Sequence, residues 1–226
     1  MATILQPPET KPEMREVAAT GILLHNISWA TYESLLKDHE GVPYPHFTYD
    51  RGELLIMTLS PEHETFNRNI ALLVEVLAEE MEVESRGFGS TTYKREDLQR
   101  GFEPDSCFYF KNEMRMRGKK RLDLTTDPPP DLIVEVDITH PSINRLPIFA
   151  AFGVPEVWRF EGEELEILRL AEGVYIKSET SVVLPLVDGE TLAGFIKKSV
   201  SMMGRLEWLR EVRAWARERK GSEETQ

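Results

Sequence analysis

The longest run of regularly spaced apolar residues in this chain begins after Ser60 and continues to about Glu84. Ser60 has the residue type that caps helix N-termini, and Pro61 fits the first helical position, where its missing N–H is harmless. The apolar residues are spaced three or four apart, at Phe66, Ile70, Leu73, Leu77 and Met81. This spacing predicts an amphipathic helix whose apolar side packs on a core.

Shorter apolar runs between turn residues predict strands. The predicted strands are 47–49, 54–57, 87–92, 102–110, 132–138, 156–160, 165–170 and 174–178. Further helices are expected at 28–38, from an Asn144 N-cap to Gly153, and at 191–220 in two pieces near Gly204. Strands and helices in this order predict an α/β fold, with a mixed sheet flanked by helices and followed by C-terminal helices.

We expect three segments along the chain. Residues 1–20 contain Pro and Glu without sustained periodicity, which indicates a flexible N-terminal arm. Residues 21–190 form the α/β domain, and residues 191–226 form a helical extension. In the extension Trp208, Val212 and Trp215 repeat at i, i+4 and i+7. Such a stripe either covers the domain's own core or joins two copies in a homodimer.

The net charge argues against one broad class of function. The 226 residues include 27 basic and 39 acidic side chains, a net charge of −12, which disfavours non-specific binding to nucleic acid. One segment departs from this balance and is a candidate contact for nucleic acid. Its basic residues are Lys111, Arg115, Arg117, Lys119, Lys120 and Arg121. The alternative is a solvated loop whose charges only offset the acidic average.

The sequence predicts a cytoplasmic protein without a membrane partner. No apolar run approaches the roughly 20 residues that span a bilayer, and no signal-peptide pattern opens the chain. Cys107 is the single cysteine, so the chain has no internal disulfide, which fits a reducing compartment.

Two acidic residues lie in strands that are otherwise apolar. Glu135 stands between Val134 and Val136, and Asp105 opens the strand before it. A desolvated carboxylate is costly unless a cation or a proton compensates it. Two such acids on neighbouring strands would suit Mg²⁺, which prefers oxygen ligands. The alternatives are a hydrogen-bonded core acid for Glu135 and a turn residue for Asp105.

The context of these acids resembles a known superfamily. Glu-Pro-Asp at 103–105 and Leu-Ile-Val-Glu-Val at 132–136 resemble the PD-(D/E)XK nucleases. Pro-Pro-Pro-Asp-Leu-Ile-Val-Glu-Val-Asp-Ile-Thr, followed by Phe-Gly-Val-Pro-Glu-Val-Trp-Arg, is similar to a bacterial family of putative restriction-endonuclease-like proteins abundant in cyanobacteria. The resemblance covers about residues 25–165.

The resemblance implies a metal-dependent endonuclease that acts on DNA. Asp105 and Glu135 would be catalytic and would hold Mg²⁺ or Mn²⁺. Asp137 points to the same side of its strand as Glu135 and is a third candidate ligand. Asp137 also stands where the superfamily has a lysine, and the matching cation of this family falls at Arg145.

Arg145 also stands out in its own helical segment, because it shares the apolar side with Ile148, Phe149 and Phe152. It is either a catalytic cation beside the acids or a structural salt bridge. Arginine contacts phosphate but does not deprotonate water, so turnover is in question. Lys94 is the next candidate cation. His63 either caps the long helix or lines the cleft.

Two functions follow, beside a third class in which the chain is a plain interaction protein that associates through the C-terminal stripe. The first is a Mg²⁺-dependent endodeoxyribonuclease. The second is a catalytically weakened protein of the same fold that binds nucleic acid or a protein partner, which the replacement of lysine favours.

Overall fold

The computed structural model describes residues 20–120, 122–124, 126–138 and 143–223, whose strands form two sheets. The order in the five-stranded sheet is β1 (Thr20–Leu24), β3 (Glu53–Thr58), β2 (His46–Asp50), β6 (Arg100–Phe102) and β5 (Tyr93–Arg95). The order in the six-stranded sheet is β11 (Val174–Ser178), β10 (Glu164–Ala171), β9 (Glu156–Glu161), β8 (Leu132–Asp137), β7 (Ser106–Tyr109) and β4 (Arg86–Gly87). Only β8 and β9 pair in parallel among these strands, so the larger sheet is mixed.

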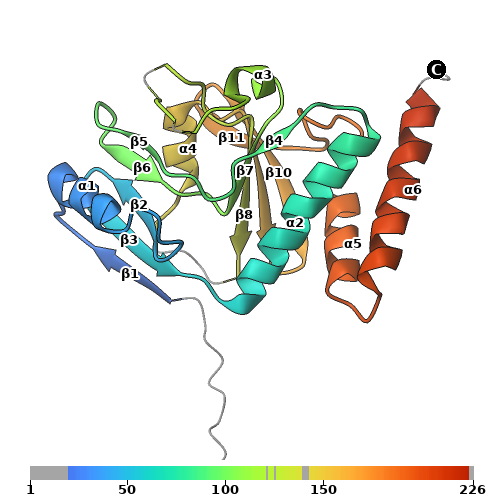
Figure 1. Ribbon diagram of the computed structural model, residues 1–226, viewed down its shortest axis with the longest axis horizontal. Helices are drawn as coiled ribbons and strands as arrows, with labels where there is room; N and C mark the ends of the chain where they lie inside the picture. Colours follow the sequence, from blue (N-terminus) through green and yellow to red (C-terminus); the bar gives the residue numbers. More distant parts are fainter. Residues whose placement is uncertain (1–19, 121, 125, 139–142, 224–226) are drawn as a thin grey trace, which may run out of the picture.

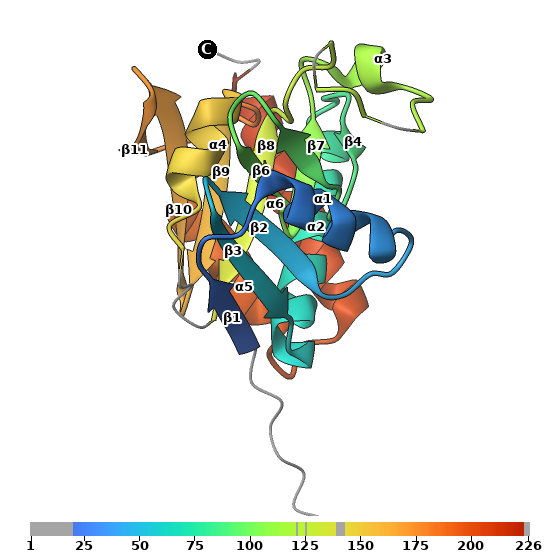
Figure 2. The same ribbon diagram turned by 90° about the vertical axis from the view of Figure 1, so that its left-hand side faces the viewer.

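Helices flank both sheets. Their bounds are α1 (Trp29–Asp38), α2 (Pro61–Glu80), α3 (Glu113–Met116), α4 (Leu146–Phe152), α5 (Gly189–Ser199) and α6 (Arg205–Glu223). Helices α2, α5 and α6 lie together on one face of the six-stranded sheet (Figure 1). The five-stranded sheet lies on the other side, in front of the larger sheet in Figure 2. The expected α/β class, with a mixed sheet and C-terminal helices, is confirmed.

Strand β8 presents its two faces to two different cores. Leu132, Val134 and Val136 pack with α2, α5 and α6. Ile133 points the other way and packs with α4 and with Phe102 of the smaller sheet. Because side chains alternate along a strand, Glu135 lies on the same face as Ile133. The odd-numbered face of β8 is therefore where the sequence places its acids.

Local signals predicted several elements correctly. Ser60 caps α2 by accepting from the backbone N–H of His63 at 3.1 Å, and Ile70, Leu73 and Leu77 are buried. Arg51 and Gly52 turn the β2–β3 hairpin with φ angles of 47° and 98°. Gly153 ends α4 in the left-handed conformation, with φ 76°. These positions depend on neighbouring residues, which a sequence pattern can reveal.

The strand predicted at 102–110 was wrong as a single element. Phe102 ends β6 in the five-stranded sheet, whereas Ser106 begins β7 in the six-stranded sheet. Pro104 lies between them, and proline cannot donate a hydrogen bond to a continuing ladder. Glu103, Pro104 and Asp105 therefore form the passage from one sheet to the other, and Asp105 sits at the junction.

Four other features differ from the prediction. The strand expected at 87–92 is replaced by β4 and β5, which belong to different sheets. Helix α2 ends at Glu80, and Glu82 takes a positive φ of 56°, which no α-helix can contain. No strand was predicted at β1. The basic segment, expected as a loop, contains the short helix α3.

The C-terminal helix covers the chain's own core. Trp208 and Val212 of α6 are buried in the core shared with α2 and α5. Arg213 pairs with Glu79 at 3.2 Å, and Arg217 pairs with Glu80 at 2.6 Å, which ties α6 to α2. This contact favours residues 191–223 as part of the folded unit, whereas a homodimer stays a prediction. Of the arm expected at residues 1–20, residues 1–19 lie outside the described residues, and Thr20 begins β1. No helix in the described part of the chain is long and apolar enough to cross a membrane.

Candidate active site

Asp105 and Glu135 meet where the two sheets join. In the β7–β8 ladder Ser106 pairs with Val134, so the antiparallel register continued by one residue sets Asp105 opposite Glu135. Both residues are buried, with 3% and 4% of their surfaces exposed. Burial raises the pKa of Glu135, and the Asp105 charge raises it further. The structure thus brings together the two acids that the sequence singled out.

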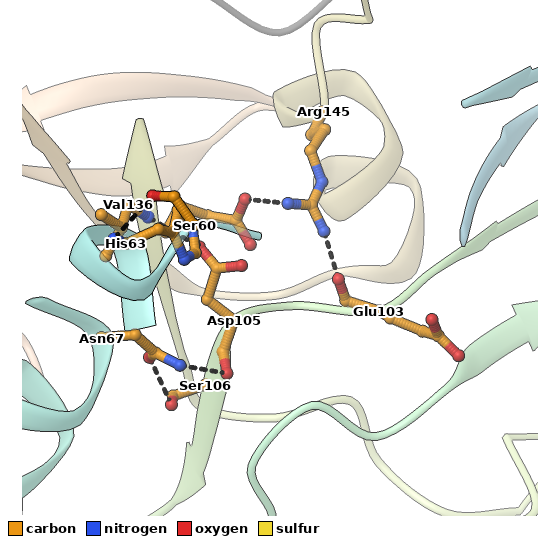
Figure 3. Close-up of polar contacts among 9 residues, drawn as sticks. Ser60, His63, Asn67, Glu103, Asp105, Ser106, Val136 and Arg145 are labelled. Atoms are coloured by element: carbon orange, nitrogen blue, oxygen red, sulfur yellow. Dashed lines mark hydrogen bonds and ion pairs between the residues drawn. The ribbon is translucent and has the colours of Figure 1, made fainter. Parts of the chain in front are cut away.

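Asp105 is held as a carboxylate. Its Oδ2 accepts a hydrogen bond from the backbone N–H of Val136 at 2.8 Å and lies 3.2 Å from His63 Nε2 (Figure 3). Burial raises the pKa of Asp105, but the hydrogen bond and charge of His63, the Arg145 charge and the Val136 N–H together outweigh it, so the pKa is lowered overall. The ionised form is therefore the stable one at neutral pH.

His63 belongs to this cluster. Its backbone N–H is capped by Ser60, while its side chain leaves the helix and reaches Asp105. Burial lowers the pKa of His63, but the hydrogen bond and charge of Asp105, the Glu64 charge and the Val136 backbone together raise it by more, so the net shift is upward from 6.5. Of the two predicted roles for His63, the structure supports a place beside the acids.

The ion pair between His63 and Asp105 should make stability depend on pH. His63 has a raised pKa, so its contribution is present below about 6.5 and is lost as pH rises through the folded value. Asp105 has a lowered pKa, so its contribution is present above about 3.8 and is lost as pH falls. In metal-free buffer, the stability gap between the parent and His63→Gln should therefore be widest between these values and narrower near pH 9. Denaturant unfolding measures it.

The exposed His25 supplies the control for this prediction, because 62% of its side chain is in solvent. His25→Gln should leave the free energy of unfolding within about 0.5 kcal/mol of the parent at each pH. A gap for His63→Gln that is the same at all pH values would mean that the two groups do not form an ion pair.

Glu135 has a different partner, Arg145. Arg145 NH1 contacts Glu135 Oε2. Arg145 NH2 donates to the backbone carbonyl of Glu103 (Figure 3). Only 7% of Arg145 is exposed. Burial raises the pKa of Glu135; the Arg145 charge lowers it and the Asp105 charge raises it, leaving the pKa well above 4.5. One of the two roles predicted for Arg145, a structural salt bridge, is thus present, and its partner is one of the two buried acids.

The position of Arg145 follows from its helix. Arg145 is the N-cap residue of α4, and Pro147 occupies the first turn. Asn144, predicted as the N-cap, lies one residue earlier and accepts from the Leu146 N–H at 3.2 Å through its side chain. The guanidinium also lies 5.4 Å from the ring of Phe149, one helical turn along. The N-terminal end of α4 therefore directs the cation toward β8.

Asp137 lies beside the pair, on the face that parity predicted. With Glu135 and Arg145 it lines a small cavity of about 50 Å³. Burial raises the pKa of Asp137; the Arg145 charge lowers it and the Asp105 charge raises it, so the net shift is upward. Three carboxylates therefore face two cationic side chains, Arg145 and His63, and the cluster can accept further positive charge.

The donor atoms suit a hard divalent cation. Asp105 Oδ1 and Glu135 Oε1 are buried without a hydrogen-bond partner among the described residues. Orphaned carboxylate oxygens are costly, and a cation would compensate them. The described residues hold no group of three or more His, Cys, Asp or Glu side chains arranged around a metal position. Mg²⁺ needs only one or two carboxylates, since waters and substrate phosphates complete its shell. Asp105 and Glu135 thus fit such an ion.

The basic segment does not join this cluster. It follows the far end of β7, and α3 lies at the opposite end of the larger sheet from the start of α2 (Figure 1). Arg117 pairs with Glu113 at 2.8 Å, and Lys119 pairs with Asp127. Arg121 lies outside the described residues. Binding of nucleic acid by Lys111, Arg115, Arg117, Lys119, Lys120 and Arg121 stays a prediction.

Lys94 also lies apart from the acids. It belongs to β5, and its Nζ is 2.6 Å from Glu33 Oε1 of α1, with 42% of the side chain exposed. This pairing gives Lys94 a surface position on the smaller sheet.

Two residues of the site were missed in the sequence. Asn67 donates to the Asp105 carbonyl at 3.0 Å and accepts from Ser106 Oγ at 2.7 Å, which fixes the start of β7. Its signal was the four-residue spacing from His63, which puts two polar residues on one side of α2. His46 is buried near the acids, and its pKa is lowered by burial against the charges of Glu103 and Asp105. No local pattern reveals His46, because pairing between β2 and β6 brings it here.

The mixed sheet, its flanking helices and the carboxylates at a sheet junction define a restriction-endonuclease-like protein. A model of the Uma2 family, described as putative restriction endonucleases, matches residues 29–199. The chain belongs to this family. Among solved structures, it resembles a putative nuclease of the DUF820 family from Anabaena variabilis, with 13% identity and a TM-score of 0.43. That match covers 80% of this chain and 98% of the other. No curated protein matches the sequence.

Proposed function

We propose that this protein is a divalent-metal-dependent endonuclease that hydrolyses phosphodiester bonds of DNA. One observation carries the proposal: Asp105, which directly precedes β7, and Glu135 of β8 are buried at neighbouring positions, and each has one carboxylate oxygen without a hydrogen-bond partner among the described residues. Membership of a family of putative restriction endonucleases supports it.

Asp105 and Glu135 would hold Mg²⁺ or Mn²⁺, with Asp137 beside them. The ion, when bound, activates a water and stabilises charge that develops at phosphorus. Burial raises the pKa values of Glu135 and Asp137, and the Asp105 charge raises them further; the charge of the ion would offset both effects.

The protein's own cations have separate tasks. His63 keeps Asp105 ionised and oriented, because it bonds the oxygen that also accepts from Val136. Arg145 holds Glu135 in place through one nitrogen and the Glu103 carbonyl through another. Arg145 Nε has no hydrogen-bond partner among the described residues. The guanidinium is therefore the positive group beside the acids that a substrate phosphate would meet.

A weakened scaffold is the second candidate. Arg145 occupies an oxygen of Glu135 in a buried ion pair, and Asp137 replaces the lysine of the superfamily. Arginine stays charged and cannot take a proton from water. This observation favours a protein that binds nucleic acid, or a protein partner, and cleaves slowly.

A cleavage assay with metal titration distinguishes the two candidates. The parent protein is incubated with labelled single-stranded and double-stranded DNA and RNA, in EDTA, Mg²⁺, Mn²⁺ or Ca²⁺. Cleavage of DNA with Mg²⁺ or Mn²⁺ and none in EDTA supports the endonuclease. Metal-dependent binding without cleavage supports the weakened scaffold. If the protein neither cleaves nor binds these nucleic acids, both candidates are overturned.

A further inference from the structure

A cavity lies directly behind the candidate active site. Its volume is about 240 Å³, and His46, Glu103, Thr92, Ser90, Val42 and Pro43 are among the residues that line it. Glu103 connects the two places. Its backbone carbonyl accepts from Arg145, while its side chain points away from Arg145 (Figure 3). The Glu103 carboxylate accepts from the Phe47 N–H at 2.9 Å and from Thr92 Oγ1 at 2.6 Å.

The pairing of β2 with β6 explains why the cavity and the acids are neighbours. Tyr49 pairs with Gly101, and beyond this pairing the Phe47 N–H donates to the Glu103 side chain at 2.9 Å. His46 therefore lies near Glu103 and Asp105, whose charges act on its ring. His46 is 6% exposed, and its Nδ1 is buried without a hydrogen-bond partner among the described residues. The charges of Glu103, Asp105, Arg145 and Glu64 act on its ring, and Tyr44 stacks on it at 5.5 Å. His46 therefore lines the cavity and also lies near the carboxylates.

The chemistry of the lining selects the occupant. Each Glu103 oxygen already accepts one hydrogen bond and can accept another, so the wall offers acceptors to N–H and O–H donors. The same negative charge disfavours a phosphate inside the cavity. Val42, Pro43 and the ring of His46 add flat and apolar surface. At 240 Å³ the cavity is below the ~300–1,000 Å³ of whole-ligand pockets, so it suits one fragment of a longer chain.

We infer that this cavity is a subsite for the nucleoside that adjoins the reactive phosphate, with His46 contacting the substrate between the base and the catalytic acids. The subsite rests on the proposed function. An unstacked base would enter the cavity, and its amino or imino groups would donate to Glu103. The substrate would then need a base that can leave its stack, as single-stranded DNA provides.

Abasic scanning of a substrate tests the subsite. The probe is an end-labelled single-stranded DNA that the parent cleaves at a mapped bond, with versions that each lack one base. The subsite predicts a fall of about 10-fold or more in kcat/KM for one version only, whose missing base adjoins the cleaved bond. An equal effect at every position, or none, would overturn it.

Val42→Trp tests the same cavity from the protein side. Val42 is 54% exposed, so the larger ring can fill the cavity while the core stays intact. The kcat/KM of the variant on the intact DNA should be about 10-fold below that of the parent. The kcat/KM of the variant should be the same on the critical abasic version as on the intact DNA. Val174→Trp is the control, because Val174 is an exposed valine on β11, and it should match the parent. Additive losses for Val42→Trp and the abasic version would contradict the subsite.

Failure of the proposed function can be told apart from failure of the subsite. If the parent cleaves nothing, the endonuclease proposal fails, and fluorescence anisotropy of the same labelled DNAs with Ca²⁺ decides the subsite. Weaker binding of a single abasic version by the parent, with no such difference in Val42→Trp, supports the subsite. Identical binding of all versions by the parent overturns it.

Discussion

Asp105→Asn and Glu135→Gln should each reduce metal-dependent cleavage by about 10²-fold or more, the scale of losing one charge-stabilising group at a developing anion. Each change removes a charge and a candidate ligand while keeping the side chain's size. In the Asp105→Asn variant the amide oxygen can still accept from the Val136 N–H, which in the parent lies 2.8 Å from Asp105 Oδ2. The measurement is kcat at saturating Mg²⁺, corrected for the folded fraction.

Glu156→Gln is the matched control for these variants. Glu156 is fully buried on β9, and its Oε1 accepts from Trp158 Nε1 and Ser181 Oγ, each at 2.6 Å. It pairs with Leu132, at the opposite end of β8 from Glu135. Its replacement should lower stability by about 1–3 kcal/mol and leave kcat unchanged. Parent-like cleavage by both Asp105→Asn and Glu135→Gln would place the activity elsewhere.

Arg145 should contribute to both turnover and stability, in ways that can be separated. Arg145→Met should reduce cleavage by about 10²-fold. It should also destabilise the fold by about 3–5 kcal/mol, because Glu135 is left buried without its cation. Arg145→Lys should retain or increase turnover, because the amine keeps the charge and can orient water. Cleavage kinetics and denaturant unfolding measure the two effects.

The double variant Arg145→Met/Glu135→Gln separates a catalytic role from a structural one. It has no unpaired buried charge at these two positions, so it should recover most of the stability and none of the cleavage. Arg213→Met is the surface control, because Arg213 pairs with Glu79 and Glu80 on α2 away from the acids. Cleavage indifferent to both Arg145→Met and Arg145→Lys would reduce Arg145 to a structural salt bridge.

The acidic pair was predictable because its signal is local. A carboxylate among β-branched residues is costly enough to indicate a compensating partner, and parity along β8 placed Asp137 beside Glu135. The break between the sheets was also encoded, in Pro104, but the apolar run from Phe102 to Phe110 masked it.

Other parts of the site depend on contacts that sequence periodicity does not contain. His63 meets Asp105 only because α2 crosses the end of β7, and His46 approaches it through the β2–β6 pairing. The basic segment misled the prediction in the opposite way. In the sequence it lies between the two strands that carry the acids, but in the structure it lies at the end of those strands that is far from the acids. Order along the chain predicts the elements, whereas antiparallel pairing decides which ends meet.

Equilibrium binding of Mn²⁺, measured by calorimetry without substrate, tests most directly whether Asp105 and Glu135 hold a metal. The proposed site predicts that the parent and Glu156→Gln bind Mn²⁺ with the same affinity. It predicts that Asp105→Asn and Glu135→Gln bind at least about 10-fold more weakly, as expected when a ligand is lost. Mn²⁺ affinity that is the same in all four proteins would contradict the proposed site.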